Sequence, residues 1–329
     1  MTLPDFELLR PTSLEEALAA LERCGPDAQV IAGGTDLIPS MKQRLFTPRV
    51  LVDLKRLREL DYICSEEDGG LGIGALTKIS ALAESPVVVE RFPVLHEAAK
   101  TVASPLLRNL GTLGGNLCLD TRCLYYNQSE FWRASLGYCL KKDGTRCHVA
   151  PGGQFCWAAF SGDTAPALLA LDARVQLAGP RGARELSLAE FYVNDGVVRV
   201  AKAPGELVTG IRIPAASAGW CGVYKKYRIR QSIDYPLAGV AAVMRKTTDG
   251  TCLEARVALT GVNPAPKLVN AAVLLRGRRY DATLAEEVAH EAIRTGKPLR
   301  TSASTPEYRR HILRVFVRRA IEQVWRNGH

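Results

Sequence analysis

The sequence lacks several features that would place it in a broad class at once. No apolar run approaches the roughly 20 residues that span a bilayer, so we expect no contact with a membrane. The segment from Met1 to Glu7 has neither the basic region nor the apolar stretch of an export signal. No repeat or low-complexity segment stands out. We therefore expect a cytoplasmic protein in a reducing compartment, where disulfides are rare.

Charge of one sign is also not concentrated in a single patch. The 329 residues carry a net charge of +9, and 47% of them are hydrophobic, which is ordinary for a globular protein of two or three domains. The densest basic group recurs at helical spacing, which favours a solvated or subunit-facing helix surface over a nucleic-acid site. It consists of Arg309, Arg310, Arg314, Arg318 and Arg319.

Cysteine, by contrast, is crowded into one stretch. Five of the nine cysteines fall between Cys118 and Cys156, within 39 residues. Clustered thiolates are soft ligands that select iron–sulfur clusters, zinc or copper(I). None of the spacings is the Cys-x-x-Cys knuckle of structural zinc, and the tight run of bacterial ferredoxins is missing too. The spacing alone leaves an iron–sulfur cluster, zinc and ordinary buried thiols open.

Two glycine-rich loops predict a nucleotide site. The apolar segment 29–32 reads as a strand that runs into Gly33-Gly34-Thr35-Asp36-Leu37 and then into a helix over 39–44. Glycine lets backbone N–H groups approach phosphate oxygens, although a tight strand-to-helix turn explains one such loop equally well. The Gly-x-Gly-x-x-Gly spacing of a Rossmann fingerprint is missing from it. A second loop over 108–116 follows about 80 residues later, and two loops favour a dinucleotide, whose diphosphate needs donors from more than one segment.

The second half of the chain reads as a boundary followed by a small domain. A strand over 206–214 ends at a proline, and residues 215–218 are small and flexible. Alternating patterns then predict three strands, and two helical patterns close the chain, which indicates an α+β layer. The strands are expected over 222–230, 238–245 and 255–259, and the helices over 284–295 and 307–325.

Four motifs, in this order, resemble those of a known family. They are Ala32 to Leu37, Arg108-Asn109-x-Gly111-Thr112-x-Gly114-Gly115-Asn116, the turn Asp163 to Pro166, and Tyr224-x-Lys226-x-x-x-Arg230-x-x-x-Asp234. The chain as a whole resembles the flavin-binding medium subunits of molybdenum hydroxylases, the relatives of xanthine dehydrogenase and carbon monoxide dehydrogenase.

The resemblance implies an α+β fold and an FAD site. It implies an FAD-binding domain of the vanillyl-alcohol oxidase type in two subdomains, 1–55 and 56–216, and a C-terminal domain of the CO dehydrogenase flavoprotein type over 217–329. It nominates no acid–base or nucleophilic residue, because the expected role is a redox relay. The residues it implies for FAD are Ile31, Ala32, Gly33, Gly34, Thr35, Asp36, Leu37, Thr77, Ala103, Gly111, Thr112, Gly114, Gly115, Asn116, Asp163 and Lys226.

An insert over 119–160 departs from the general family pattern. It resembles the insert of the beta subunits of 4-hydroxybenzoyl-CoA reductases, which carries a four-iron four-sulfur cluster. The resemblance implies Cys123, Cys139, Cys147 and Cys156 as its ligands. Cys118 follows the second glycine loop directly and is expected to pack there as a small apolar residue. The neighbouring His148 is expected to be a polar loop residue, with ligation as the alternative.

This finer resemblance implies an oxidoreductase subunit of anaerobic aromatic degradation. Electrons would pass from ferredoxin through the cluster and FAD to a subunit with a two-iron cluster and on to a molybdenum cofactor subunit, in a dimer of heterotrimers. Basic residues of the insert would favour a reduced cluster and an acidic donor, or form an ordinary solvated surface; they are Arg122, Lys141, Lys142 and Arg146. Two alternatives remain: a related hydroxylase subunit working oxidatively, and a zinc-stapled assembly protein without flavin.

Overall fold

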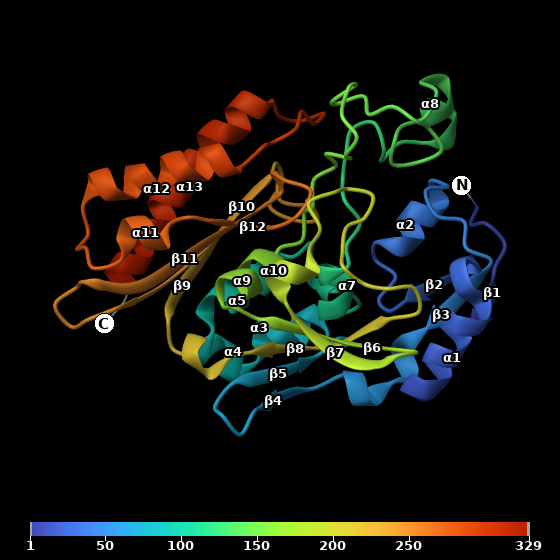
Figure 1. The fold of residues 1–329 in the computed structure, drawn as a ribbon, viewed down its shortest axis with the longest axis horizontal. Helices are drawn as coiled ribbons and strands as arrows, with labels where there is room; N and C mark the ends of the chain where they lie inside the picture. The colour runs from blue at the N-terminus through green and yellow to red at the C-terminus, as the bar shows by residue number, and fades with distance from the viewer. Residues whose placement is uncertain (1, 328–329) are drawn as a thin grey trace.

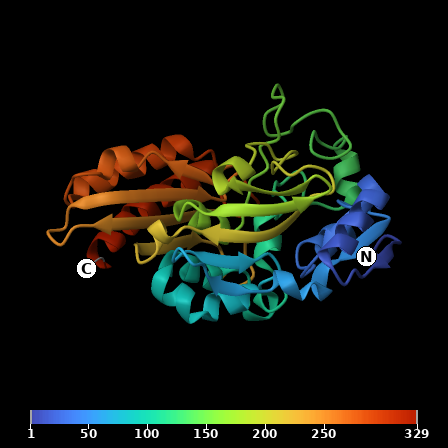
Figure 2. The same ribbon diagram turned by 60° about the horizontal axis from the view of Figure 1, so that its bottom comes forward.

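The computed structural model describes residues 2–327 and contains three sheets (Figure 1). A small parallel sheet holds the N-terminal segment, an antiparallel sheet of five strands lies in the middle, and an antiparallel sheet of four strands belongs to the C-terminal part. Figure 2 shows them following one another along the long axis. Within residues 2–327, none of the helices is both long and apolar enough to cross a membrane.

The first sheet presents the first glycine loop. Its order is β1-β3-β2, from Glu7–Leu9, Val50–Asp53 and Ala28–Ile31, and all pairs are parallel. Helix α1 (Leu14–Cys24) packs on it through an apolar stripe, and α2 (Leu37–Lys42) follows the loop. Ser13 caps α1, since its hydroxyl accepts from the Glu16 amide at 3.2 Å, and the Glu16 carboxylate accepts in turn from the Thr12 amide at 2.7 Å.

The second sheet has the order β4-β5-β8-β6-β7 and carries helices on one face. Its strands are Ile63–Ser65, Leu71–Gly74, Leu207–Ile213, Arg174–Gly179 and Gly182–Ser187. The helices of this part are α3 (Ile79–Glu84), α4 (Pro86–Arg91), α5 (Pro93–Thr101), α6 (Pro105–Arg108), α7 (Leu113–Leu117), α9 (Thr164–Ala170) and α10 (Leu188–Phe191).

The third sheet has four strands where the sequence predicts three. The order is β12-β11-β10-β9, from Lys267–Val269, Cys252–Thr260, Ala238–Lys246 and Cys221–Tyr227. Strand β12 was missed because three residues are too few for an alternating pattern. The short helix α11 (Ala272–Leu275) precedes the two long helices that the sequence predicts, α12 (Ala282–Thr295) and α13 (Pro306–Asn327).

Two apolar cores meet at this third sheet. One face packs on α12 and α13 around buried Leu284, Leu313 and Val317. The other face packs on α5 and α9, so that Val243 and Ala258 join the core of the second sheet. Helices α5 and α9 are therefore covered on both sides, which ties the C-terminal part to the middle one.

The insert projects from the second part and closes at its base. Arg122 and Ala159 exchange two backbone hydrogen bonds, of 2.7 and 2.8 Å. Helix α8 (Glu130–Ser135) lies in the insert, on the same side of the molecule as α2 (Figure 1). The buried guanidinium of Arg133 donates to the carbonyls of Gln43 and Arg44 just after α2, at 3.0 and 3.2 Å. The insert is thus docked on the first sheet's domain.

A buried arginine fixes the start of α13. Arg309 is 2% exposed, and its guanidinium donates to the carbonyl oxygens of Leu237, Gly261 and Leu299. Burial lowers the pKa of Arg309 to about 10, so the side chain stays charged at neutral pH. Three carbonyls replace the water that this charge would otherwise keep.

We expect Arg309→Ala to lower the free energy of unfolding by about 3 kcal/mol or more, because it leaves three buried carbonyls without a donor. The matched control is Arg326→Ala at the other end of α13, where an exposed side chain pairs with Glu322 alone among residues 2–327. It should cost less than about 1 kcal/mol. Urea unfolding of both variants measures the difference, and equal losses would contradict this account of Arg309.

Candidate functional site

The two glycine loops line one large cavity. Its volume is about 570 Å³, within the roughly 300–1,000 Å³ of small-molecule and cofactor sites. The structure brings fourteen of the sixteen predicted FAD residues to its wall: Ile31, Ala32, Gly33, Gly34, Thr35, Asp36, Leu37, Ala103, Gly111, Thr112, Gly114, Gly115, Asn116 and Asp163.

Close packing explains the first glycine pair. A Cβ on Gly33 would overlap the carbonyl oxygen of Leu110, in the turn just before Gly111. Gly34 has φ +71°, which side chains other than glycine rarely adopt. The backbones of the two loops are therefore in direct contact. In the second loop the Thr112 hydroxyl accepts from the Gly115 amide at 3.2 Å and caps helix α7.

Thr77 and Lys226, the other two predicted FAD residues, stand behind the cavity wall. The Thr77 hydroxyl donates to the Tyr62 carbonyl at 2.8 Å. The Lys226 ammonium donates to the Asp163 carboxylate and to the Thr101 carbonyl, both at 2.9 Å. Neither residue lines the cavity, and Lys226 contacts the lining residue Asp163 from behind.

Asp163 is held by a buried polar cluster. It is 3% exposed and accepts from the Tyr224 hydroxyl at 2.7 Å as well as from Lys226. Burial raises the pKa of Asp163 and lowers the pKa of Lys226, while each charge counteracts the shift of the other. The cluster links the start of α9 to strand β9, so the C-terminal part fixes one wall of the cavity.

The cavity mouth contains backbone strain. Ala103 and Ile233 both adopt positive φ, +40° and +69°, although neither is glycine. The Ile233 amide donates to the Ala103 carbonyl at 2.9 Å, which joins the two segments. Such conformations persist only where the surroundings enforce them, and they gather at binding sites.

The sequence missed polar residues that come from distant segments. Asp120, Arg122, Arg199, Lys202 and Tyr235 also line the large cavity. No motif marks Arg199 or Lys202. Arg122 was expected in the surroundings of the insert's cysteines, whereas the structure also places it against the first glycine loop.

Four cysteines of the insert converge on a second, small cavity. Cys123, Cys139, Cys147 and Cys156 line it together with Lys141 and aromatic neighbours. Its volume is about 20 Å³, little more than one water needs. All nine cysteines are free thiols in the described structure. Burial raises the pKa of Cys123, and that of Cys156 to about 11.

Four thiols are a suitable set of ligands for a soft metal, but the cysteine side chains are too far apart to bind a single ion. Thiolates around a single zinc lie roughly 3.8 Å apart, given a Zn–S bond of about 2.3 Å. Within residues 2–327, no three His, Cys, Asp or Glu side chains stand close enough to hold one ion. A multi-iron cluster holds its thiolates farther apart than one ion does, and the cavity of about 20 Å³ would have to widen to admit it.

Of the two other candidates of this stretch, Cys118 lies apart from the four cysteines, whereas His148 lines the same small cavity. Cys118 lines the large cavity, and burial raises the pKa of its thiol, in agreement with a packed apolar role. The His148 ring lies 5.1 Å from the Tyr125 ring, and its Nε2 lies 2.5 Å from the Tyr138 carbonyl oxygen. His148 touches the small cavity with its ring engaged in these contacts.

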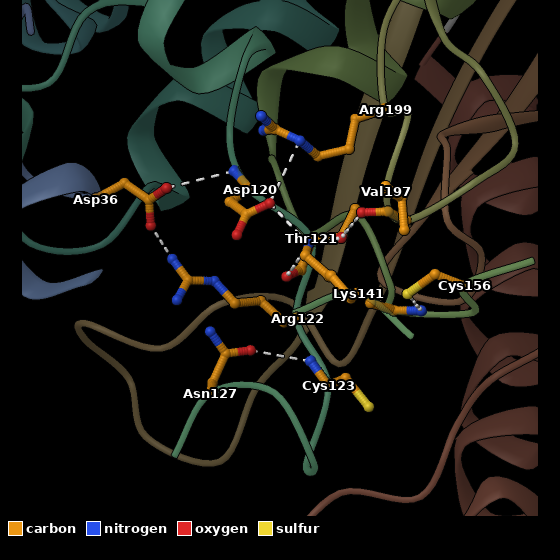
Figure 3. A network of polar contacts seen from close by, with 12 residues as sticks. Asp36, Asp120, Thr121, Arg122, Cys123, Asn127, Lys141, Cys156, Val197 and Arg199 are labelled. Atoms are coloured by element: carbon orange, nitrogen blue, oxygen red, sulfur yellow. Dashed lines mark hydrogen bonds and ion pairs between the residues drawn. The ribbon is translucent and has the colours of Figure 1, made fainter. Parts of the chain in front are cut away.

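A network of five charged side chains joins residues that line the large cavity to Lys141, which lines the small one (Figure 3). Asp36, in the first glycine loop, accepts from the Asp120 amide at 3.3 Å and pairs with Arg122. The Asp120 carboxylate pairs with Lys141 at 2.7 Å and with Arg199 at 3.3 Å. Within this network two carboxylates pair with three cations, and the carboxylate of Asp195 lies nearby, where it accepts from the Cys156 amide at 3.2 Å.

Comparison with known proteins places this architecture. Residues 4–216 match the family described as the FAD binding domain in molybdopterin dehydrogenase, and residues 222–324 match the CO dehydrogenase flavoprotein C-terminal domain. The carbon monoxide dehydrogenase medium chain of Hydrogenophaga pseudoflava is 32% identical over 327 residues, covering 99% of each chain. The FAD-binding subunit of an Escherichia coli aldehyde oxidoreductase is 37% identical over 276 residues, covering 81% of this chain and 84% of that one.

Solved structures agree with the family match. The carbon monoxide dehydrogenase of Hydrogenophaga pseudoflava superposes with a TM-score of 0.83 at 31% identity over the whole of both chains. Quinoline 2-oxidoreductase from Pseudomonas putida 86 gives a TM-score of 0.79 at 25% identity, covering 100% of this chain and 99% of that one. The predicted fold class and the general resemblance are confirmed, while the finer resemblance to 4-hydroxybenzoyl-CoA reductases stays a prediction. The chain belongs to the family of FAD-binding medium subunits of molybdenum hydroxylases.

Proposed function

We propose that this chain is the electron-transfer subunit of a molybdenum hydroxylase that works in the oxidative direction. The supporting observation is the large cavity between the glycine loops, in a chain whose relatives are named as dehydrogenases and an oxidoreductase. Its partners would be a molybdenum cofactor subunit and a subunit with a two-iron cluster, in a dimer of heterotrimers. A cytoplasmic location stays a prediction.

FAD would occupy the large cavity. The diphosphate would lie against the two glycine loops, which line the cavity with residues that carry no side chain at Gly33, Gly34, Gly114 and Gly115. Bound FAD accepts two electrons and releases them one at a time, which suits a relay. The chain would hold FAD in residues 1–55 and 56–216 and close one wall with Asp163, positioned by residues 217–329 through Lys226.

We expect Gly33→Ala to lose most of its bound FAD, because the added methyl group meets the Leu110 carbonyl and separates the loops. Gly152→Ala is the matched control, since a Cβ there meets nothing within 4 Å. Flavin absorbance per chain measures the effect, with circular dichroism as the test of folding. A folded Gly33→Ala chain with full FAD content would overturn this assignment of the cavity.

The insert would hold a four-iron four-sulfur cluster. Four cysteines, three of them buried and Cys123 partly exposed, converge from separate parts of the insert and are not paired as disulfides. Burial raises the pKa of the Cys123 and Cys156 thiols, so these two would need a nearby cation to ionise, and cluster iron would supply one. The cluster would exchange single electrons with FAD.

Anaerobically purified protein should contain about four iron atoms per chain, and Cys147→Ala should lose this iron while keeping FAD. Cys252→Ala is the control, because that buried cysteine lies in strand β11, in the C-terminal part. Iron, sulfide and zinc analysis with EPR after dithionite reduction provides the measurement. Zinc in place of iron would favour a zinc-stapled insert, and a wild-type protein free of metal would overturn the cluster.

The insert also favours a second candidate function, in the reductive direction. A cluster beside FAD would allow ferredoxin to deliver electrons for the dehydroxylation of 4-hydroxybenzoyl-CoA, as the finer resemblance predicts. The complete complex should then release benzoyl-CoA when supplied with reduced ferredoxin and this thioester. Failure of that reaction, together with dye reduction by an aldehyde or an aromatic heterocycle, would leave the oxidative function standing alone.

A further inference from the structure

A single lysine connects the four-cysteine cavity to the wall of the FAD cavity. Lys141 lines the small cavity, and its partner Asp120 lines the large one. The ammonium and the carboxylate are 2.7 Å apart, and their side chains are only 6% and 4% exposed. Figure 3 shows the pair between Arg199 on one side and Cys156 on the other.

The ammonium of Lys141 is held in place by more than Asp120. It donates to the carbonyl oxygen of Thr121 at 3.2 Å and to the hydroxyl of the same residue. It also lies 4.3 Å from the centre of the Tyr126 ring, a cation–π contact. These contacts orient the charge at a fixed point of the cavity wall.

Lys141 differs in this respect from the other basic side chains of the insert. Lys142 is its neighbour in sequence, but its side chain is 28% exposed and pairs with the half-exposed Asp143 at 3.3 Å. Arg146 is exposed. Water screens these two charges, whereas a buried charge acts at nearly full strength on its neighbours.

Structural cohesion alone does not explain the balance of charge. Burying an ammonium is costly, and a neutral donor could bridge Thr121 and Asp120 at lower cost. The network keeps three cations against two carboxylates, and Asp120 Oδ2 has no hydrogen-bond partner among the described residues. Of the three cations, Lys141 is the one that lines the four-cysteine cavity.

We propose that Lys141 is a positioning residue that raises the reduction potential of the insert's metal site, and that Asp120 lowers the same potential. The inference rests on the proposed four-iron cluster. Reduction adds one electron from the reductant and no proton, so the site becomes more negative by one charge. A fixed ammonium beside the thiolates stabilises that reduced form, and a nearby carboxylate opposes it.

The test compares cluster potentials in four variants of the full chain, purified anaerobically in its complex and titrated with dithionite under EPR. Lys141→Met should lower the reduction equilibrium constant at least tenfold, which is about 59 mV for one electron. Lys141→Arg, which keeps the charge, should retain the wild-type value. Asp120→Asn should shift the potential in the opposite direction, and Lys142→Met should change the constant less than about twofold.

The opposite signs separate tuning from cohesion. If Lys141 and Asp120 only hold the insert together, both variants lose iron and neither moves the potential of the iron that remains, which would overturn the inference. If Lys141→Met retains no iron, the Asp120→Asn shift decides, and an unchanged potential in that variant rejects the proposal. Wild-type protein without iron rejects the cluster of the proposed function, and this inference with it.

Discussion

The contact between Gly33 and the Leu110 carbonyl is the constraint on which the site depends. The first loop comes from the parallel sheet and the second from the helical layer of the five-stranded sheet, more than 70 residues later. Only a residue without a Cβ allows the two to touch. Once they touch, the backbones of both loops line one cavity, and the remaining walls are supplied by segments packed around that contact.

Charge then links the cavity to the insert. The carboxylate of Asp36, in the first loop, pairs with Arg122 and accepts from the Asp120 amide at the start of the insert. The Asp120 carboxylate pairs with Lys141, which lines the four-cysteine cavity. The Arg122 guanidinium also lies over the Tyr235 ring, 4.4 Å from its centre, and donates to its hydroxyl at 2.7 Å. Arg122 therefore joins the glycine loop, the insert and the C-terminal part at one point.

Local chemistry explains what could be predicted from the sequence. The glycine pairs, the alternating strands of the third sheet and the two closing helices each have a signal within a few residues, and the structure contains all of them. The large-cavity residues Arg199 and Tyr235 lie far from both loops in the chain and carry no such signal. Thr77 and Lys226 were predicted at the FAD site but do not line the large cavity. The direction of their side chains depends on packing, which a motif does not reveal.

The four cysteines converge only because the insert folds back on itself. Their spacing in the sequence did not decide between an iron–sulfur cluster, zinc and ordinary thiols. The central claim is that one chain places a second redox centre beside FAD. An anaerobic reductive titration of the full-length chain tests it most directly, by counting electrons taken up per FAD. The account predicts about three electrons, two for FAD and one for a four-iron cluster. An uptake of about two, with a flavin spectrum alone, would contradict it.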